Sequence, residues 1–522
     1  FICIPAHHAI APFAHPRTLH WEIQVHKWLT QQHYGASNAY TRGFFPPEMC
    51  FSERLIPILV DEGFAWTVVA NNHLARACGN FPYIHGTGGE MCDPPNKADQ
   101  VNPDGANWMR MQIDRGCSPC NAIPFSVQPH YARYYDPHTG AEKKIIVVPA
   151  EMALSWKDGY SPQGTGAIEA HIAPYNDTAH PCLVLLGHDG DNAWGGGYSY
   201  YHEAVPNFTG AASIRPTTIE QYLADHPVDA GDIVHVEDGG WVNADGDFGS
   251  PQMINWTWFL WKDGRVDIEQ GWHYKLRDYA IRMAALNYVL DAEAAAGAAN
   301  LSAARIAEPY SSGASAAEKA WHFYLGSLDS GFQYYGNPGD NEIRVSIACN
   351  EAYDWATAAI GSSPDLTGPC VWTPQRHPYN PGGKSFGPQT GYVLKDMPKD
   401  FHVWTFAYDR GGITDIRTVF RTDKDGANST ANNHNETFAG GTDVNPWQSQ
   451  AMTDRGEFPR TMDGFGGLEN IHYELPTVIA HHYWTMITAE TNTLYDYFIV
   501  ATDAAGHSTT SDIQHVFVGA ST

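Results

Sequence analysis

The sequence has 522 residues, enough for about three domains. Its formal net charge of −27, from 31 basic and 58 acidic residues, disfavours binding to nucleic acid and to anionic membranes, which are bound through basic patches. No apolar run approaches the ~20 residues of a membrane-spanning helix, so the composition favours a protein without a membrane span that binds an uncharged ligand.

The chain begins with an apolar run at residues 1–4, and it shows no signal-peptide pattern. We expect that the N-terminus is processed or that further residues precede it. Six Asn-x-Ser/Thr sequences permit a secreted, periplasmic or cell-surface location. Nine cysteines are an odd number, so at least one is unpaired within the chain. Four of them crowd one Gly/Pro-rich segment, where disulfides, a four-cysteine zinc site and reduced thiols are all open: Cys78, Cys92, Cys117 and Cys120.

A carboxylate follows the first strand of a predicted β-α-β unit at residues 40–70. Ser52 can cap a helix with apolar residues at helical spacing, and the mostly apolar run at 64–70 is typical of a buried strand. Glu48 therefore lies after the first strand and before the helix. Catalytic residues concentrate at this carboxyl-end edge of parallel β-α units, so Glu48 is a candidate.

A second carboxylate follows a later strand. Residues 71–140 show no clear period and indicate a long insertion. Strands are then predicted at 145–148 and 182–186, and Asp189 comes directly after the second. Its neighbours Gly190, Asp191 and Asn192 also fit a simple turn or a calcium loop. Two carboxylates that face one pocket are the minimum equipment for cleaving a glycosidic bond.

The pattern changes after residue 265. Helices are predicted at 274–295, 314–328 and 342–360, and a Pro/Gly-rich stretch follows to about residue 400. Residues 401–522 alternate apolar and polar side chains between turn sequences, which is typical of a β-sandwich. We therefore expect three domains, at 1–265, 266–395 and 396–522.

Histidines and aromatic residues supply further candidates. His7, His8 and His15 follow the first apolar run; they predict either hydrogen bonds to substrate or backbone, or a metal site. Trp241 belongs to a tryptophan cluster that fits a core or a cleft. The Gly-flanked loop that begins at Asp329 and contains Tyr334 and Tyr335 is predicted to point at a site.

Several of these segments resemble glycoside hydrolase family 57. Gly43-Phe-Phe-Pro-Pro-Glu48 with Ser52-Glu-Arg-Leu resembles the nucleophile region of that family, and His188-Asp189-Gly-Asp191-Asn-Ala-Trp194 resembles its acid/base region, usually Asp-Gly-Glu-Asn-Pro-Trp. Ala6-His-His-Ala-Ile-Ala-Pro12, Ser155-Trp-Lys-Asp158 and the helices around 270–360 resemble other parts of the family. The resemblance covers about residues 1–360.

This resemblance implies an α/β fold with an incomplete (β/α)7 barrel followed by a helical domain. The alternating pattern at 401–522 adds an immunoglobulin/fibronectin-like β-sandwich after them. The resemblance also implies a retaining hydrolase or transglycosylase acting on α-glucans, with Glu48 as nucleophile, Asp189 as general acid/base, and no metal or other cofactor. The residues expected to bind substrate are His8, Asp191, Trp194, Trp241, Asp329, Tyr334 and Tyr335.

Two departures from the family pattern keep alternatives open. The His-Gln segment of the family's opening strand is absent, so upstream residues, a homo-oligomer or another polypeptide would supply the first strands. Asp191 stands where the family usually has Glu. The rival hypotheses are a metal-dependent polysaccharide deacetylase or α-mannosidase-like hydrolase, and a non-catalytic surface or assembly protein on a degenerate glycosidase fold.

Overall fold

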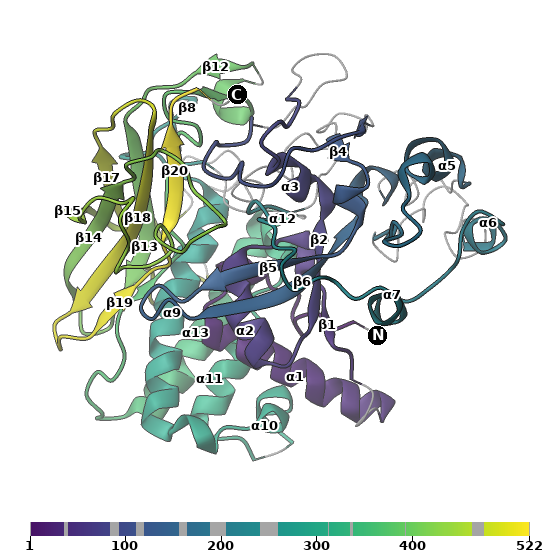
Figure 1. Ribbon diagram of the computed structural model, residues 1–522. Coiled ribbons are helices and arrows are strands. Elements are labelled where there is room, and N and C mark those ends of the chain that lie inside the picture. Colours follow the sequence, from purple (N-terminus) through teal and green to yellow (C-terminus); the bar gives the residue numbers. More distant parts are fainter. Residues whose placement is uncertain are drawn as a thin grey trace.

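The computed structural model describes residues 2–35, 40–83, 93–110, 120–155, 164–187, 205–240, 259–311, 313–334, 338–391, 393–461 and 474–520. Within them, a parallel sheet, a group of helices and two antiparallel sheets pack against one another (Figure 1). Among these residues, every helix is too short or too polar to cross a membrane.

A four-stranded sheet lies at the centre of the N-terminal part. Its strands, in order, are β1 (Gly43–Phe44), β2 (Trp66–Ala70), β6 (Glu142–Ala150) and β5 (His130–Tyr135). The first three are parallel, and β5 runs antiparallel to β6. Single parallel bridges join Cys3 to Phe44 and Leu185 to Ala150. Five parallel segments thus lie side by side in chain order, as successive β-α units produce.

The structure tests the strands predicted for this region. Those at 64–70 and 145–148 are confirmed as β2 and β6, and β2 is buried along its whole length. The prediction of a strand at 182–186 is wrong: Leu185 forms a single bridge to Ala150, and no continuous strand forms there. The segment 71–140, which shows no period, contributes β5 and a short hairpin of β3 (Trp108–Arg110) and β4 (Cys120–Ala122).

Helices connect the parallel segments. α1 (Pro16–Tyr34) leads to β1; His15 Nδ1 accepts from the Arg17 N–H at its start, and Gly35 ends it at φ 65°. The predicted cap at Ser52 is wrong, because its side chain makes no cap bond. A 3-10 turn, η3 (Glu53–Leu55), forms instead, and α2 (Ile56–Asp61) begins beyond it with Pro57 in the first turn, where no N–H partner is needed.

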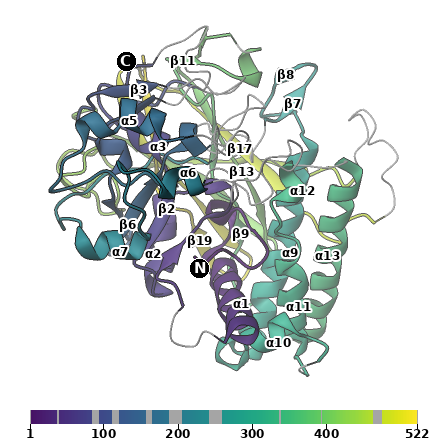
Figure 2. The same ribbon diagram turned by 90° about the vertical axis from the view of Figure 1, so that its right-hand side faces the viewer.

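The three long helices predicted after residue 265 are confirmed. They are α9 (Tyr274–Ala296), α11 (Ala316–Leu325) and α13 (Pro338–Ile360), and they lie alongside α1 and α10 (Ala303–Ala307) (Figure 2). Ser315 and Glu318 form a capping box that sets the start of α11. α9 is buried on nearly all sides because it lies between the other helices and an antiparallel sheet whose strand β13 (Phe401–Tyr408) packs against it.

Two antiparallel sheets form the C-terminal part. The first contains β10 (Gln375–His377), β13 (Phe401–Tyr408), β17 (His481–Ile487) and β16 (Thr453–Glu457), with β9 (Cys370–Val371) beside β13. The second contains β15 (Gln448–Ala451), β14 (Ile413–Thr422), β18 (Thr493–Asp503) and β19 (Ser508–Thr510), with β20 (Gln514–Val518) beside β18. Their facing apolar side chains share one core, which includes Phe401, Val403, Ile487, Ile499 and Val516.

The remaining elements are short. They are η1 (Ala11–Phe13), η2 (Pro47–Met49), α3 (Asn71–Arg76), η4 (Phe125–Val127), α5 (Gly166–His171), η5 (Ala173–Tyr175), α6 (Val205–Thr209), α7 (Ile219–Asp225), β7 (Trp261–Lys262), β8 (Arg265–Val266), η8 (Ala298–Asn300), α12 (Gly331–Tyr334), β11 (Lys384–Ser385), η9 (Pro388–Thr390) and β12 (Lys395–Asp396).

The cysteine alternatives are partly decided. Cys78 is a buried free thiol whose pKa burial raises to about 12, so the disulfide interpretation does not hold for this residue. Cys120 is also buried, and Cys92 and Cys117 lie outside the described residues. Free thiols also stand at Cys3, Cys50, Cys182, Cys349 and Cys370.

Candidate active site at the edge of the parallel sheet

Polar side chains follow the parallel segments at the edge where those segments end. His7 and His8 come after the Cys3 segment, and Glu48 after β1. Asn71 follows β2, and Glu151 follows β6. Because the carboxyl ends of parallel strands meet at one edge, this is where a β-α fold assembles a catalytic centre.

Glu48 lies in a turn with unusual backbone geometry. It occupies η2 at φ 58° and ψ 20°, and Met49 follows at φ 53°. Two consecutive non-glycine residues in the left-handed region cost free energy and persist only when their surroundings fix them. Gly240 packs against this turn: a Cβ there would lie 3.0 Å from the Glu48 carbonyl oxygen. The turn is thus held from behind, and its side chain stands at the sheet edge.

The Glu48 carboxylate receives a hydrogen bond from a residue far away in the sequence. Ser330 Oγ donates to Glu48 Oε1 at 2.7 Å, and His8 Nδ1 lies 2.8 Å from the same hydroxyl. Since the single hydroxyl proton goes to the carboxylate, His8 Nδ1 donates to Ser330 Oγ. His8 Nδ1 is also 3.7 Å from Glu48 Oε1. The three side chains form a relay that fixes the rotamer of Glu48.

Backbone pairing between two distant segments places Ser330 next to His8. Ala9 and Asp329 form an antiparallel bridge, and the Ser330 N–H donates to the His8 carbonyl at 3.3 Å. Asp329 Oδ1 accepts from the Gly331 N–H at 2.7 Å and so caps α12. The structure therefore brings three of the predicted site residues together: Glu48, His8 and Asp329.

His7 anchors the relay to α1. Its backbone N–H donates to Glu22 Oε2 at 2.8 Å, and its Nδ1 lies 2.7 Å from Glu22 Oε1. Burial lowers the pKa of His7, but the charge of Glu22 and its hydrogen bond outweigh that effect, and the pKa is raised. His15 instead caps α1, so His7, His8 and His15 each bond to a different protein partner.

Glu151 is a further carboxylate at this edge that sequence reasoning missed. Its side chain is fully buried and accepts hydrogen bonds from Asn121 Nδ2 at 3.0 Å and from the Leu154 N–H at 2.5 Å. Asn71 Nδ2 lies 3.5 Å from it. Burial raises its pKa to about 6. Its position directly after a predicted strand was the available signal.

The segment that leads to Asp189 is attached next to Glu151. The Glu151 N–H donates to the Leu185 carbonyl at 2.9 Å, and Ser155 Oγ donates to the Glu151 carbonyl at 2.6 Å. The Gly187 N–H in turn donates to Ser155 Oγ at 3.0 Å. Asp189 lies two residues further on, outside the described residues, and its distance from Glu48 stays a prediction.

Other predicted site residues also fall outside the described part of the chain. Asp191, Trp194, Trp241 and Tyr335 do so, and Tyr334 is described only as the backbone end of α12. The residues before Trp241 are firmly placed: Gly239 pairs with Phe51, and a Cβ on Gly239 would lie 1.9 Å from a ring carbon of His73.

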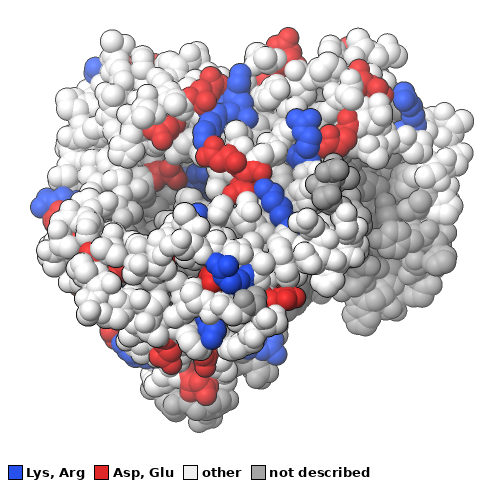
Figure 3. Space-filling model, turned by 90° about the horizontal axis from the view of Figure 1, so that it is seen from below, with Lys and Arg blue, Asp and Glu red and all other residues white. Residues whose placement is uncertain are grey.

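Charge on the surface is mixed in sign. On the face seen in Figure 3, acidic and basic side chains are interspersed among uncharged residues, without a large basic patch.

Comparisons with known proteins give one curated relative and two solved structures of note. No family model matches the chain. The chain is 30% identical over 598 residues to the alpha-amylase of Niallia circulans; the match covers 98% of this chain but 46% of that protein. The chain thus spans about half the length of this relative.

The two solved structures match with low TM-scores. The glycoside hydrolase family 57 branching enzyme of Thermococcus kodakaraensis gives a TM-score of 0.41 at 9% identity, covering 70% of this chain and 68% of that one. The 4-alpha-glucanotransferase of Thermococcus litoralis gives 0.40 at 12% identity, covering 96% and 72%.

Proposed function

We propose that this chain carries the catalytic centre of a retaining enzyme of glycoside hydrolase family 57 that acts on α-glucans. The observation that carries the proposal is the placement of Glu48: it stands past a parallel strand, in a fixed left-handed turn, with its carboxylate held by Ser330. The relative named alpha-amylase, aligned over 98% of this chain, supports the substrate class. The resemblance of the segments around Glu48 and Asp189 to the family's catalytic regions supports the assignment of roles.

The fold that goes with this function is an incomplete (β/α)7 barrel, a helical domain and a β-sandwich, with boundaries near residues 265 and 395. The five parallel segments in chain order support the barrel. The shared core of the two antiparallel sheets supports the sandwich.

Hydrolysis or transfer would proceed by double displacement. Glu48 attacks the anomeric carbon and forms a glycosyl ester, while Asp189 protonates the leaving oxygen. Asp189 then removes a proton from water or from an acceptor sugar, which releases the glycosyl group with retained configuration. Ser330 keeps the attacking carboxylate in one orientation, so less conformational freedom is lost in the transition state. Retention requires the two carboxyl groups to be ~5–5.5 Å apart.

Substrate would be held by residues around this pair. His8 and Asp329 lie beside Glu48. Asp191, Trp194, Trp241, Tyr334 and Tyr335 would complete the subsites, with aromatic rings stacking on sugar rings. The chemistry assigned to the two carboxylates requires no metal.

Replacement of the two carboxylates tests the proposal. Glu48→Gln and Asp189→Asn should each lower turnover of soluble starch by at least ~10³-fold while the protein stays folded. Glu142→Gln is a matched control, because Glu142 lies at the opposite end of β6 and is partly exposed. Rates in Glu48→Gln and Asp189→Asn equal to those of Glu142→Gln would reject the assignment.

The metal-dependent rival requires histidines that converge on one ion. Among the described residues, His7, His8 and His15 do not belong to a group of three ligand atoms close enough to share one ion, which disfavours that hypothesis. The rival of a non-catalytic surface or assembly protein predicts that the unaltered protein does not turn over α-glucan.

A further inference from the structure

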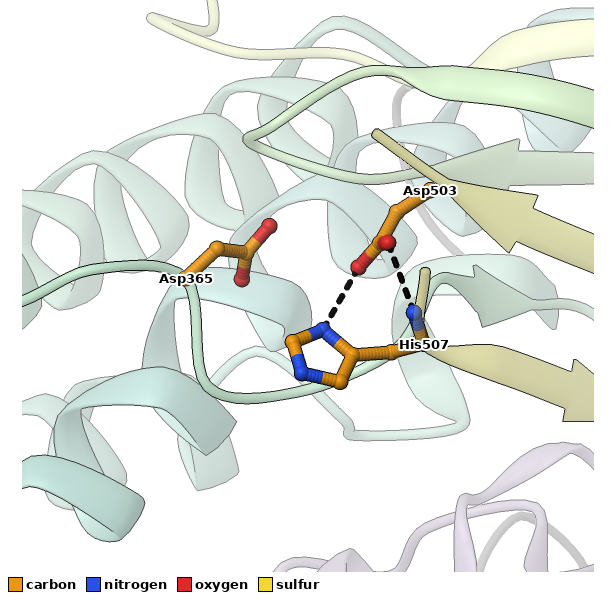
Figure 4. Close-up of side chains that lie close together, drawn as sticks. All are labelled: Asp365, Asp503 and His507. Atoms are coloured by element: carbon orange, nitrogen blue, oxygen red, sulfur yellow. Dashed lines mark hydrogen bonds and ion pairs between the residues drawn. The ribbon is translucent and has the colours of Figure 1, made fainter. Parts of the chain in front are cut away.

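Three potential metal ligands from distant parts of the chain meet outside the candidate active site. Asp365 lies in the segment after α13, Asp503 ends β18, and His507 precedes β19. One ligand atom of each lies within 4.8 Å of the others. Figure 4 shows the Asp365 carboxylate pointing toward the Asp503–His507 pair.

Asp365 carries a carboxylate that no N–H or hydroxyl donor of the described residues reaches. Its side chain is 10% exposed, and both of its oxygens are buried without a hydrogen-bond partner among the described residues. The nearest cation is Arg410, whose Nε lies 3.7 Å from Asp365 Oδ1 and already donates to Asp291. A buried carboxylate without a hydrogen-bond partner raises the free energy of the folded state. A further positive group close to Asp365 would remove this cost.

The surroundings add negative charge. Asp291 and Asp409 lie close to Asp365; within the described part of the chain, Arg410 pairs with Asp291 and Asp365, and His507 pairs with Asp503. Asp503 is 2% exposed. Four carboxylates thus gather around one arginine and one histidine.

The Asp503–His507 pair is already oriented as a ligand group. The His507 N–H donates to Asp503 Oδ1 at 2.8 Å, and His507 Nδ1 lies 2.8 Å from Asp503 Oδ2. The pair holds the two side chains at a separation from which both can reach one ion, which would replace the proton that His507 Nδ1 shares with Asp503. The ring is turned toward the side from which Asp365 approaches (Figure 4).

We propose that Asp365, Asp503 and His507 bind a divalent transition-metal ion, with zinc as the best match. Metal–ligand distances of about 2.0–2.6 Å place ligands of one ion within about 4–5 Å of each other, as observed here. The imidazole favours zinc over calcium or magnesium, which prefer oxygen ligands alone. The ion would join the segment after α13 to the β18–β19 turn and so fix the second antiparallel sheet to the helices.

Metal titration of the full chain tests this site. Protein treated with EDTA and dialysed is titrated with ZnCl2, MnCl2 and CaCl2 in a calorimeter, and its Tm is measured with and without each ion. We expect one equivalent of zinc with a Kd below about 1 μM, and a Tm higher by several degrees. Calcium should bind at least ~100-fold more weakly.

Two variants and one control assign the binding. Asp365→Asn should bind one zinc fewer, and its Tm in EDTA should equal or exceed that of the parent because a like charge is removed. His507→Gln should also lose this zinc. It is the test variant to use if Asp365→Asn does not fold. His481→Ala is the matched control, since His481 forms a similar exposed pair with Asp454; it should retain the zinc.

The readouts do not involve catalysis, so they are independent of the proposed function. Equal zinc stoichiometry and equal Tm shifts in the parent, Asp365→Asn and His507→Gln would overturn the proposal. A parent that binds no zinc, with a Tm that responds only to pH, would also overturn it and would indicate a proton shared between Asp365 and Asp409.

Discussion

His515 offers a test of the buried charges in the second antiparallel sheet. It lies in β20, with Nδ1 2.8 Å from Asp496 Oδ1 and Nε2 3.2 Å from Glu436 Oε1. Burial lowers its pKa, but the Glu436 charge and the hydrogen bonds to both carboxylates outweigh burial and raise the pKa to about 10. We predict that His515→Gln weakens the dependence of stability on pH above neutrality.

The magnitude follows from the two pKa values. Because the folded pKa of His515 is raised above its ordinary 6.5, the stabilisation is fully present below pH 6.5 and is lost as the pH rises through about 10. Between pH 7 and pH 9 the free energy of unfolding should therefore fall by about 2.5 kcal/mol through this residue. Buried thiols such as Cys349, whose pKa burial raises to about 12, add to the alkaline loss in parent and variant alike.

Urea denaturation at pH 7 and pH 9 measures the effect as a difference between parent and variant. The parent should lose about 2.5 kcal/mol more than His515→Gln over this range. His481→Gln, at an exposed pair with Asp454, is the control and should follow the parent. Parallel losses in the parent and in His515→Gln would refute the reasoning.

Three further predictions follow from the candidate site. Ser330→Ala removes the donor to the Glu48 carboxylate, and a hydrogen bond to a charged group contributes about 1.5–3 kcal/mol, so kcat on α-glucan should fall ~10- to 100-fold with little change in KM. Gly239→Ala should lower the free energy of unfolding by ~1–3 kcal/mol, measured by urea denaturation, because its Cβ would lie 1.9 Å from the His73 ring. Glu151 has a pKa raised from 4.5 to about 6, so the free energy of unfolding should fall by about 2 kcal/mol as the pH rises from 4.5 through 6, and this loss should be absent in Glu151→Gln.

Controls make these outcomes specific. Gly166→Ala introduces a Cβ that meets nothing within 4 Å and should leave stability nearly unchanged. A Gly239→Ala variant as stable as Gly166→Ala would contradict the packing argument. Unchanged kcat in Ser330→Ala would show that the relay from His8 does not orient Glu48. A Glu151→Gln variant with the same pH slope as the parent would assign that slope to other groups.

The elements with strong local signals were predictable from the sequence. Apolar residues at helical spacing predicted α9. The uniformly apolar run at 64–70 predicted β2, which is buried on both faces. Ser52 misled because its Pro-containing neighbourhood forms a 3-10 turn before the helix begins. The strand expected at 182–186 has the right composition, but only Leu185 has a pairing partner. Pairing is decided by tertiary neighbours, which composition does not reveal.

The candidate site was predictable only in part. Glu48 stands out in the sequence because it directly follows a strand. Ser330, which orients it, does not stand out, since the two residues are 282 positions apart and meet only through the pairing of Ala9 with Asp329. Glu151 follows a strand as Glu48 does, but its hydrogen bonds to Asn121 come from an insertion with no periodic signal.

The nucleophile assignment of Glu48 is the central claim, and covalent trapping tests it most directly. The protein that carries this chain is incubated with a fluorinated α-glucosyl fluoride, which slows release of the glycosyl group, and the digested protein is analysed by mass spectrometry. The account predicts one glycosyl ester, located on Glu48, and none in Glu48→Gln. A glycosyl ester on another carboxylate, or α-glucan turnover that proceeds with inverted configuration, would contradict it.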